Sequence, residues 1–403
     1  MFRIIISITA IMISIVIIQL ANGMVGPTIM LNANSAGASL SSVGMIPTIY
    51  GLGFVLGCFW ARKLLNTIGH IRSFTVAAAM LAALTLMMHL ISDTFAWIVF
   101  RGIMGASIAI IMTCIDSWVG HVTPNEMRGR VIGFYSTMIK FAYVGAPALL
   151  SYSILISERA IIFAVLLFII SLIPVCMTKL PQPTIGPVTT TSFKALLKDV
   201  PSSFVAVFVL GLTNSAVLNL LPVYGVKIGF NVSQALTLLM MAHLGGLLFQ
   251  WPLGYLSDIF TRRKIMSTSF LISAAAAVGM SFSDSTTNSM ILSFIWGGAA
   301  LSVYSVSLAH AIDHVKSEET VAVCATMLTT WSIGSIFGPM IAGILMGSTS
   351  VYALYIFCAV CHGIAGILIL IRLMTTARRI RMEIKLNQIS TEDASWPQQR
   401  PLS

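Results

Sequence analysis

The stretch HVTPNE at residues 121–126 returns as HVKSEE at residues 314–319, which is 193 residues later in the chain. Each copy follows an acidic residue, Asp116 before the first and Asp313 before the second, and each lies between long apolar segments. A matching motif in a matching context is the mark of an internal repeat. The chain is therefore predicted to consist of two similar halves.

The composition assigns these halves to a lipid bilayer. Of the 403 residues, 57% are hydrophobic and 9% are charged, and the mean hydropathy is +0.94; these values exclude a soluble globular protein. A helix of about 20 apolar residues crosses a hydrocarbon core of about 30 Å, and twelve segments of the chain meet that length. The predicted spans are residues 3–24, 42–61, 72–91, 94–118, 129–153, 160–178, 201–224, 233–256, 265–282, 288–312, 320–345 and 351–373.

The predicted fold is an all-α membrane protein with twelve transmembrane helices in two six-helix, pseudo-symmetric halves, residues 1–178 and 201–374. Residues 179–200 contain several prolines and are predicted to be a cytoplasmic linker. Residues 375–403 form a predicted cytoplasmic tail that starts with a short basic helix on anionic lipid and ends in about a dozen disordered residues. The first span also has an alternative interpretation as a secretory signal, but it lacks a clean cleavage site near Gly23.

The distribution of Lys and Arg predicts the orientation of the helices. Nineteen of the 23 basic residues lie at the N-terminus, in the even-numbered loops or in the tail, whereas the odd-numbered loops carry only Arg159 and Lys227. Because basic loops stay in the cytoplasm, both termini are predicted to be cytoplasmic. The net charge of +10 follows from this topology and predicts no nucleic-acid partner. Arg101 and Lys140 remain, and both fall inside predicted helices.

The loop GYLSDIFTRRK between the eighth and ninth spans, residues 254–264, is predicted to be a gate at the cytoplasmic face. Gly254 would let two helices approach closely. Asp258 would accept hydrogen bonds from a helix N-terminus or from an arginine across the seam between the halves, while Arg262 and Arg263 hold the end in place. A charged loop that only obeys topology is the alternative interpretation.

The same gate is predicted to include three residues at the cytoplasmic ends of other spans: Asp116, His310 and Asp313. His310 and Asp313 are three residues apart and share one helix face. In the first half, Ala61 occupies the position that matches the acid of the loop, so the first gate is incomplete.

Glycine and proline recur in the fifth and eleventh spans, where they would allow close packing and helix bending. The residues are Gly334, Gly338, Pro339 and Gly343 in the eleventh span and Gly145 and Pro147 in the fifth.

These features together resemble the major facilitator superfamily, and within it the chain is similar to the YcaD-like branch. The similarity covers nearly all twelve spans and implies a secondary transporter whose central cavity lies between the halves and opens alternately to each side. It does not name a substrate. The segments that carry it are GHIRSF at 69–74, DSW at 116–118, NSAVLNLLPVYGVKIG at 214–229, LLFQWPLGYLSD at 247–258 and SLAHAIDHV at 307–315.

Ionisable residues at membrane depth are candidates for the transport pathway, because a charge that faces lipid is costly. Lys140 lies near the middle of the fifth span and is the first candidate for an anionic group or a coupled proton; a lysine that snorkels or meets backbone carbonyls is the alternative. Arg101 matches a basic position that the resemblance associates with proton coupling, with structural pairing as its alternative. His243 is a candidate for proton movement, whereas His362 is expected to be a neutral packing residue.

Three asparagines complete the candidates, although each is better suited to a tie between helices than to a ligand contact. They are Asn22, Asn214 and Asn219, in the first and seventh spans, which line the cavity in the superfamily.

Two motifs are set aside as accidental matches. Cys358, Cys361 and His362 spell a haem-attachment pattern inside an apolar span, and GLGFVLG at residues 51–57 mimics a nucleotide-binding loop without a preceding strand. No P-loop is present, so ATP is not the expected energy source. We predict no cofactor and no metal site.

The sequence thus predicts a secondary active transporter and not an enzyme. Its predicted substrates are small organic solutes or xenobiotics, with proton coupling and with export favoured over uptake. It is predicted to be a monomer of the bacterial inner membrane. A receptor or scaffold that keeps the fold without moving solute is the alternative.

Overall fold

The computed structural model describes residues 2–123, 125–152, 158–177, 200–283, 285–315 and 319–393. The predicted linker up to residue 199 and the predicted disordered end at residues 394–403 lie outside the described residues, as do Pro124 in the first repeat motif and residues 316–318 in the second. The helices are α1 Phe2–Ser35, α2 Leu40–Ile68, α3 His70–Leu90, α4 Thr94–Val122, α5 Asn125–Tyr152, α6 Glu158–Ile170, α7 Leu172–Cys176, α9 Pro201–Lys227, α10 Val232–Ile259, α11 Arg262–Ser281, α12 Thr286–Ile312, α13 Thr320–Ser348 and α14 Ala353–Asp393.

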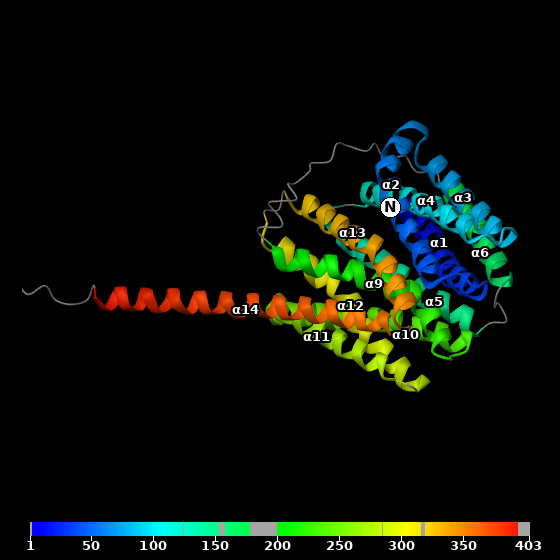
Figure 1. The fold of residues 1–403 in the computed structure, drawn as a ribbon. Helices are drawn as coiled ribbons and strands as arrows, with labels where there is room; N and C mark the ends of the chain where they lie inside the picture. The colour runs from blue at the N-terminus through cyan, green and yellow to red at the C-terminus, as the bar shows by residue number, and fades with distance from the viewer. Residues whose placement is uncertain are drawn as a thin grey trace, which may run out of the picture.

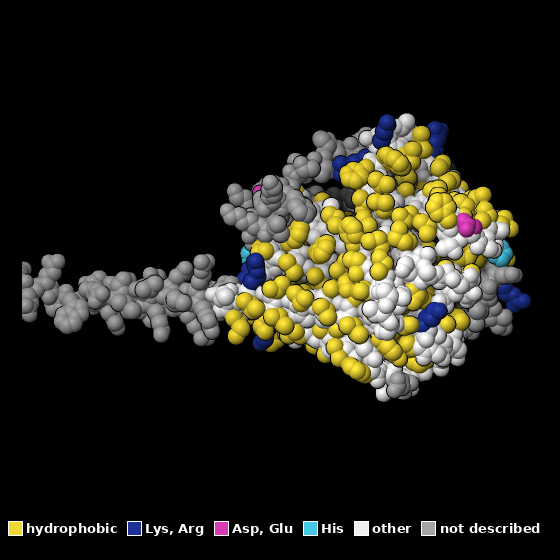
Figure 2. Space-filling model, in the orientation of Figure 1, with side chains coloured by type: hydrophobic (Ala, Val, Ile, Leu, Met, Phe, Trp, Pro, Cys, Tyr) yellow, Lys and Arg dark blue, Asp and Glu magenta, His cyan; other side chains and the backbone are white. Residues whose placement is uncertain are grey.

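Eleven of the described helical spans are long and apolar enough to cross a membrane. The short α7 continues the direction of the chain after α6, and α5 is the twelfth helix, which carries Lys140 and a charged N-terminal turn. Hydrophobic side chains cover much of the face in Figure 2, while most of the Lys and Arg side chains lie near its rim. The twelve-helix membrane fold predicted from the sequence is confirmed.

The helices run further than the apolar spans predicted, because capping residues rather than hydropathy fix many of their ends. The Ser39 side chain accepts from Ser42 N before α2, and the Asp93 side chain accepts from Ala96 N before α4. Asn231 and Gln234 form a reciprocal capping box at the start of α10. Helix boundaries read from hydropathy alone therefore fall short.

The C-terminal helix corrects one expectation. We predicted that the twelfth span ends near residue 373 and that a separate short helix follows, but α14 continues unbroken to Asp393. In Figure 1 its second part projects away from the bundle. The residues after Ala377 include Arg, Met, Glu and Lys, which favour helices, and no Gly or Pro interrupts the sequence before Asp393.

The packing repeats along with the sequence. α2 packs along α4 as α10 packs along α12, α1 packs against α5 as α9 packs against α13, and α3 packs against α6 as α11 packs against α14. The contacts between the two sets follow the same rule, since α2 meets α13 and α5 meets α10. This correspondence is the pseudo-symmetry that the 193-residue repeat predicted.

Glycines at equivalent places bring these helices into backbone contact. A Cβ atom on Gly53 of α2 would lie 2.7 Å from the carbonyl carbon of Gly102 in α4. In the second set, a Cβ atom on Gly245 of α10 would lie 2.7 Å from the backbone nitrogen of Gly298 in α12. Close approach of this kind is how membrane helices associate without a hydrophobic driving force between them.

The two sets of helices touch at one end and separate at the other. We call the end that carries Arg62 and Arg262 the basic end, and the other the opposite end. At the opposite end, a Cβ atom on Gly343 of α13 would lie 3.1 Å from the Gly44 Cα atom of α2. Toward the basic end, α2 and the start of α13 lie apart in Figure 1, and Figure 2 shows a dark hollow between these parts.

Candidate functional site

The α5–α10 seam is polar over much of its length. At the opposite end, Ser151 shares hydrogen bonds of 3.0 Å with Ser233 Oγ and 2.8 Å with Thr237 Oγ1, while Ser233 donates to the Ser151 carbonyl at 2.8 Å. Further along the seam, the rings of Tyr143 and His243 stack with centroids 5.5 Å apart and planes 11° from parallel. The hydroxyl contacts close this end of the seam, and the stacked rings lie beneath them.

Lys140 lies one turn further toward the basic end on the same face of α5. Its Nζ atom donates a hydrogen bond to Gln250 Oε1 of α10, so the lysine links the two sets of helices. The alternative in which Lys140 rests on backbone carbonyls is not what the structure shows. At 1.5 Å per residue, Lys140 lies roughly 22 Å from the start of α5 and roughly 18 Å from its end. It is therefore a cation at mid-membrane depth.

Arg101 of α4 belongs to a second polar group within the first set of helices. Its guanidinium carbon lies 4.1 Å above the centre of the Tyr50 ring of α2. Asn22 of α1 donates to the Tyr50 hydroxyl at 3.2 Å. The Arg101 side chain is 3% exposed, and its Nε and Nη1 atoms have no hydrogen-bond partner. A cation–π contact lowers the cost of burying this charge but leaves two donors unsatisfied.

The two polar groups adjoin one another. A Cβ atom on Gly23, next to Asn22, would lie 3.6 Å from the Tyr143 ring, so α1 carries the Asn22 region against α5. Lys140 in turn lies one helical turn from Tyr143, whose ring stacks on His243. We call these seven side chains the central cluster: Asn22, Tyr50, Arg101, Lys140, Tyr143, His243 and Gln250.

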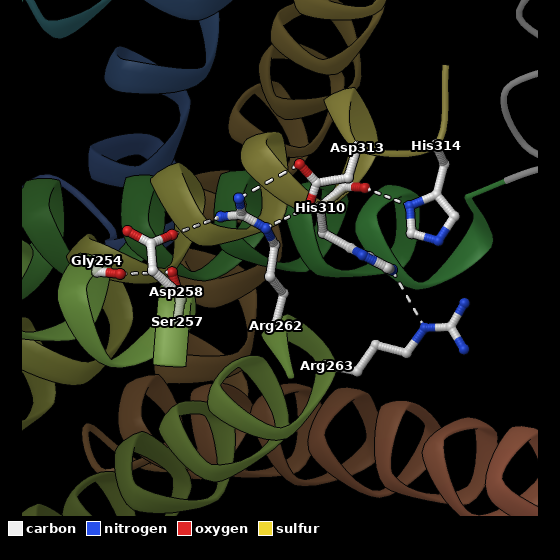
Figure 3. A network of polar contacts seen from close by, with 8 residues as sticks. All are labelled: Gly254, Ser257, Asp258, Arg262, Arg263, His310, Asp313 and His314. Carbon is white, nitrogen blue, oxygen red and sulfur yellow. Dashed lines mark hydrogen bonds and ion pairs between the residues drawn. The ribbon is translucent and has the colours of Figure 1, made fainter. Parts of the chain in front are cut away.

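A separate ionic network lies at the basic end, where α10, α11 and α12 meet (Figure 3). Arg262 at the start of α11 forms a two-pronged ion pair with Asp313 after α12, and its Nη1 atom lies 3.6 Å from Asp258 at the end of α10. Arg263 donates from Nε to His310 Nε2 at 3.2 Å. The sequence placed these five residues in one predicted gate together with Gly254 and Asp116, and the five lie side by side in the structure.

Two expectations about this network need correction. The Asp258 carboxylate pairs with Arg262 within the second set of helices, not with an arginine across the seam. Gly254 does not sit in a close helix contact, since a Cβ atom there would meet nothing within 4 Å. Both follow from the separation of the two sets at this end, which leaves the Gly254 face of α10 without a partner helix.

Asp116 lies apart from that network, in the first set of helices. Its carboxylate accepts a hydrogen bond of 3.2 Å from the Tyr135 hydroxyl of α5 and is exposed. Asp116 and Asp313, which precede the two repeat motifs, therefore have different partners.

Two asparagine candidates remain, one with a hydrogen bond inside its own helix and one with a side-chain oxygen that has no hydrogen-bond partner. Asn219 donates to the Ser215 carbonyl of its own helix at 2.8 Å, which is a local contact. The Asn214 Oδ1 atom is buried without a hydrogen-bond partner. Neither residue is linked to the central cluster by a described hydrogen bond. Among the described residues, no group of three His, Cys, Asp or Glu side chains is placed to hold a metal ion.

The glycines of the eleventh span are contact points. A Cβ atom on Gly338 would lie 2.7 Å from Ser215 Oγ of α9, and one on Gly334 would lie 2.8 Å from the Leu212 nitrogen. Pro339 and Gly343 face Gly44 of α2. In the fifth span Gly145 is under no such restriction, since its nearest neighbour is Leu20 Cδ1 at 3.5 Å, and Pro147 lies within the helix.

His362 of α14 is a packing residue, as expected. Its two ring nitrogens form hydrogen bonds of 2.7 Å with Thr213 and Ser273, and its side chain is fully buried. We expect His362→Leu to destabilise the protein by about 2 kcal/mol, since two buried hydroxyls lose a partner, without changing transport per folded molecule. Thermal unfolding in detergent and flux in liposomes measure the two effects; loss of flux at unchanged stability would contradict this assignment.

Sequence reasoning missed three members of the central cluster: Tyr50, Tyr143 and Gln250. Each is a polar side chain well inside an apolar helix, and that is the signal that selected Lys140 and Arg101. Charged residues stand out in an apolar span more clearly than tyrosine and glutamine, which complete the cluster by hydrogen bonding and ring contacts.

Comparison with known proteins agrees with this architecture. The sequence model of the Major Facilitator Superfamily matches residues 11–251 and 204–398. An uncharacterized MFS-type transporter, YcaD, of Escherichia fergusonii is 24% identical over 323 residues, covering 79% of this chain and 83% of its own. YcaD of Salmonella paratyphi A is 23% identical over 352 residues, covering 86% and 90%.

Solved structures share the fold. A mutant of the nucleoside transporter NupG superposes with a TM-score of 0.76 at 11% identity, covering 91% of this chain and 99% of its own. A bacterial homolog of the human lysosomal transporter Spinster, inward-facing and unoccupied, superposes with a TM-score of 0.71 at 14% identity, covering 92% and 95%. The family match spans most of the described helices and both repeats, and the protein therefore belongs to the major facilitator superfamily of membrane transporters.

Proposed function

We propose that this protein is a proton-coupled secondary transporter of small organic solutes or xenobiotics that works by alternating access. The observation that carries the proposal is the central cluster, which spans the seam between the two sets of helices through Lys140–Gln250 and Tyr143–His243. A solute held by residues of both sets is bound in the middle of the membrane and is released when the sets rock. His243 and Lys140 are the groups on this seam that can exchange a proton.

The two ends of the protein differ in this conformation. Ser151, Ser233 and Thr237 join the two sets of helices at the opposite end, whereas α2 and the start of α13 lie apart toward the basic end (Figure 1). With the basic loops and both termini in the cytoplasm, this conformation is open to the cytoplasm, where an exported solute is loaded. We propose export, from the cytoplasm of a bacterium across its inner membrane, by a monomer whose halves are residues 1–178 and 201–374.

The gate residues have a role in this cycle. When the cytoplasmic side closes, the bare Gly254 face of α10 gains a partner helix, and the network of Asp258, Arg262 and Asp313 comes next to the first set of helices. Asp116, His310 and Arg263 are proposed to act at the same side. The Gly334–Pro339 segment of α13 is proposed to bend as it slides along α9.

The experiment uses the purified protein in liposomes that contain a trapped pH dye, with a panel of organic anions, amino acids, sugars and cationic drugs. We expect one class of solute to trigger a proton flux, and we expect Lys140→Ala to abolish it because the cation of the seam is gone. Lys227→Ala, a basic residue at the opposite end, serves as the matched control and keeps the flux. Solute binding without any flux of solute or protons would favour a receptor instead.

A further inference from the structure

We propose that the central cluster selects an organic anion, a carboxylate attached to a flat ring, and that Arg101 and Lys140 are the two cations that recognise it. This inference rests on the proposed transport function and adds the chemical class of its substrate. It starts from the charge of the cluster. Arg101 and Lys140 are both basic, and the described ion pairs of the protein all belong to Arg262 at the basic end.

The partners of the two cations are neutral. Lys140 donates to the amide oxygen of Gln250, and Arg101 lies over the ring of Tyr50. The acid of the neighbouring helices, Asp116, is bound by Tyr135 and lies about four helical turns from Arg101 along α4. Two positive charges at membrane depth with neutral partners favour a bound anion, because an anion offsets the cost of keeping them from water.

The unsatisfied donors of Arg101 indicate which group of the ligand would bind there. Its Nε and Nη1 atoms are buried and have no hydrogen-bond partner, although guanidinium donors are among the groups that most need one. These two nitrogens lie on different edges of the planar group, so each can donate a separate hydrogen bond to an oxygen of a bound anion such as a carboxylate. The fixed position of the guanidinium above Tyr50 orients these donors before the ligand arrives.

The rest of the ligand is indicated by the aromatic groups. Tyr143 and His243 present a pair of nearly parallel rings on the two sides of the seam, and both side chains are partly accessible. Parallel, offset rings are the arrangement that accepts or extends to another flat ring. Lys140, one turn from Tyr143, adds a second positive charge beside this surface. The cluster thus combines a carboxylate anchor with a stacking surface.

Direct binding to the detergent-purified full-length protein tests the proposal. The probes are benzoate, phenylacetate, indole-3-acetate and 2-naphthoate, each compared with its neutral primary alcohol or amide and with its primary amine. We expect at least one carboxylate to raise the melting temperature and to bind at least tenfold more tightly than its neutral and cationic counterparts. Equal binding of the neutral counterpart, or no binding by any carboxylate, would overturn the proposal.

Variants separate recognition from folding. Arg101→Lys keeps the charge but removes the planar set of guanidinium donors, and we expect it to weaken carboxylate binding at least tenfold with a melting temperature near that of the parent. Lys140→Gln should weaken the same binding, Tyr143→Leu should weaken aromatic carboxylates more than acetate, and the control Lys227→Gln should change neither. Unchanged binding in both Arg101→Lys and Lys140→Gln contradicts the assignment.

This binding assay contains no gradient, so it separates the two proposals. Carboxylate binding without flux in liposomes would leave the anion site standing and remove the transport function. Flux of neutral or cationic solutes without carboxylate binding would support the transport function and rule out the anion site.

Discussion

A protein in which Ser151 and Ser233 are both replaced by cysteine loses transport when the pair is oxidised and regains it on reduction. The two hydroxyl oxygens are 3.0 Å apart across the α5–α10 seam, which places two sulfur atoms within reach of a disulfide bond. The bond would join the two sets of helices at the opposite end. Because alternating access requires this end to open once in every cycle, the crosslinked protein cannot release solute there, and the expected loss is complete.

The experiment is made in a background in which the six native cysteines have been replaced and transport persists. The matched control is Ser283→Cys with Ser289→Cys, whose hydroxyls are also 3.0 Å apart but lie in the second set of helices alone. Oxidation of that pair should leave the flux intact. Full flux in the crosslinked Ser151–Ser233 protein, with the crosslink shown by mass spectrometry, would rule out opening at this end.

The second large effect concerns folding. We expect Gly53→Ala to destabilise the protein by about 3 kcal/mol and Gly53→Leu to prevent a folded, monodisperse protein. The added Cβ atom would lie 2.7 Å from the Gly102 carbonyl carbon and 3.0 Å from its Cα atom. Both are backbone atoms of α4, so neither can turn aside as a side chain can, and the two helices must move apart along their contact.

The control is Gly363→Ala in α14, where a Cβ atom would meet nothing within 4 Å. Alanine is the better helix former there, so we expect a small gain in stability. Melting curves from size-exclusion chromatography of the detergent-solubilised variants compare the two. A Gly53→Ala protein that melts with the parent would mean that the α2–α4 contact is looser than the structure has it.

The sequence predicted the number of helices, their pairing into halves and the membrane environment, because each depends on composition and repetition along the chain. It also singled out Lys140, Arg101, Asn22 and His243 as polar residues at membrane depth, since a polar residue in an apolar span stands out. Distances between helices cannot be found in this way. That Lys140 meets Gln250 across the seam depends on how two helices 110 residues apart in sequence are rotated.

The errors had a physical cause too. Gly254 was expected in a close helix contact, and Asp258 was expected to accept from a helix N-terminus or from an arginine across the seam, because a charged, glycine-containing loop suits such contacts. In the structure Asp258 pairs with Arg262 in its own half, and a Cβ atom on Gly254 would meet nothing within 4 Å. One sequence serves at least two arrangements in an alternating-access protein, and its residues therefore carry signals for contacts that no single state contains.

The hydrogen bonds between hydroxyl groups at the opposite end contribute to the free energy needed to open that end. Ser151, Ser233 and Thr237 are neutral, so opening separates no ions, and each neutral hydrogen bond contributes only about 1 kcal/mol net. The two states can then lie within a few kcal/mol of each other, and a ligand with a differential affinity of that size shifts most of the population. A small difference between a ligand's affinities for the two states is then sufficient to shift the equilibrium between them.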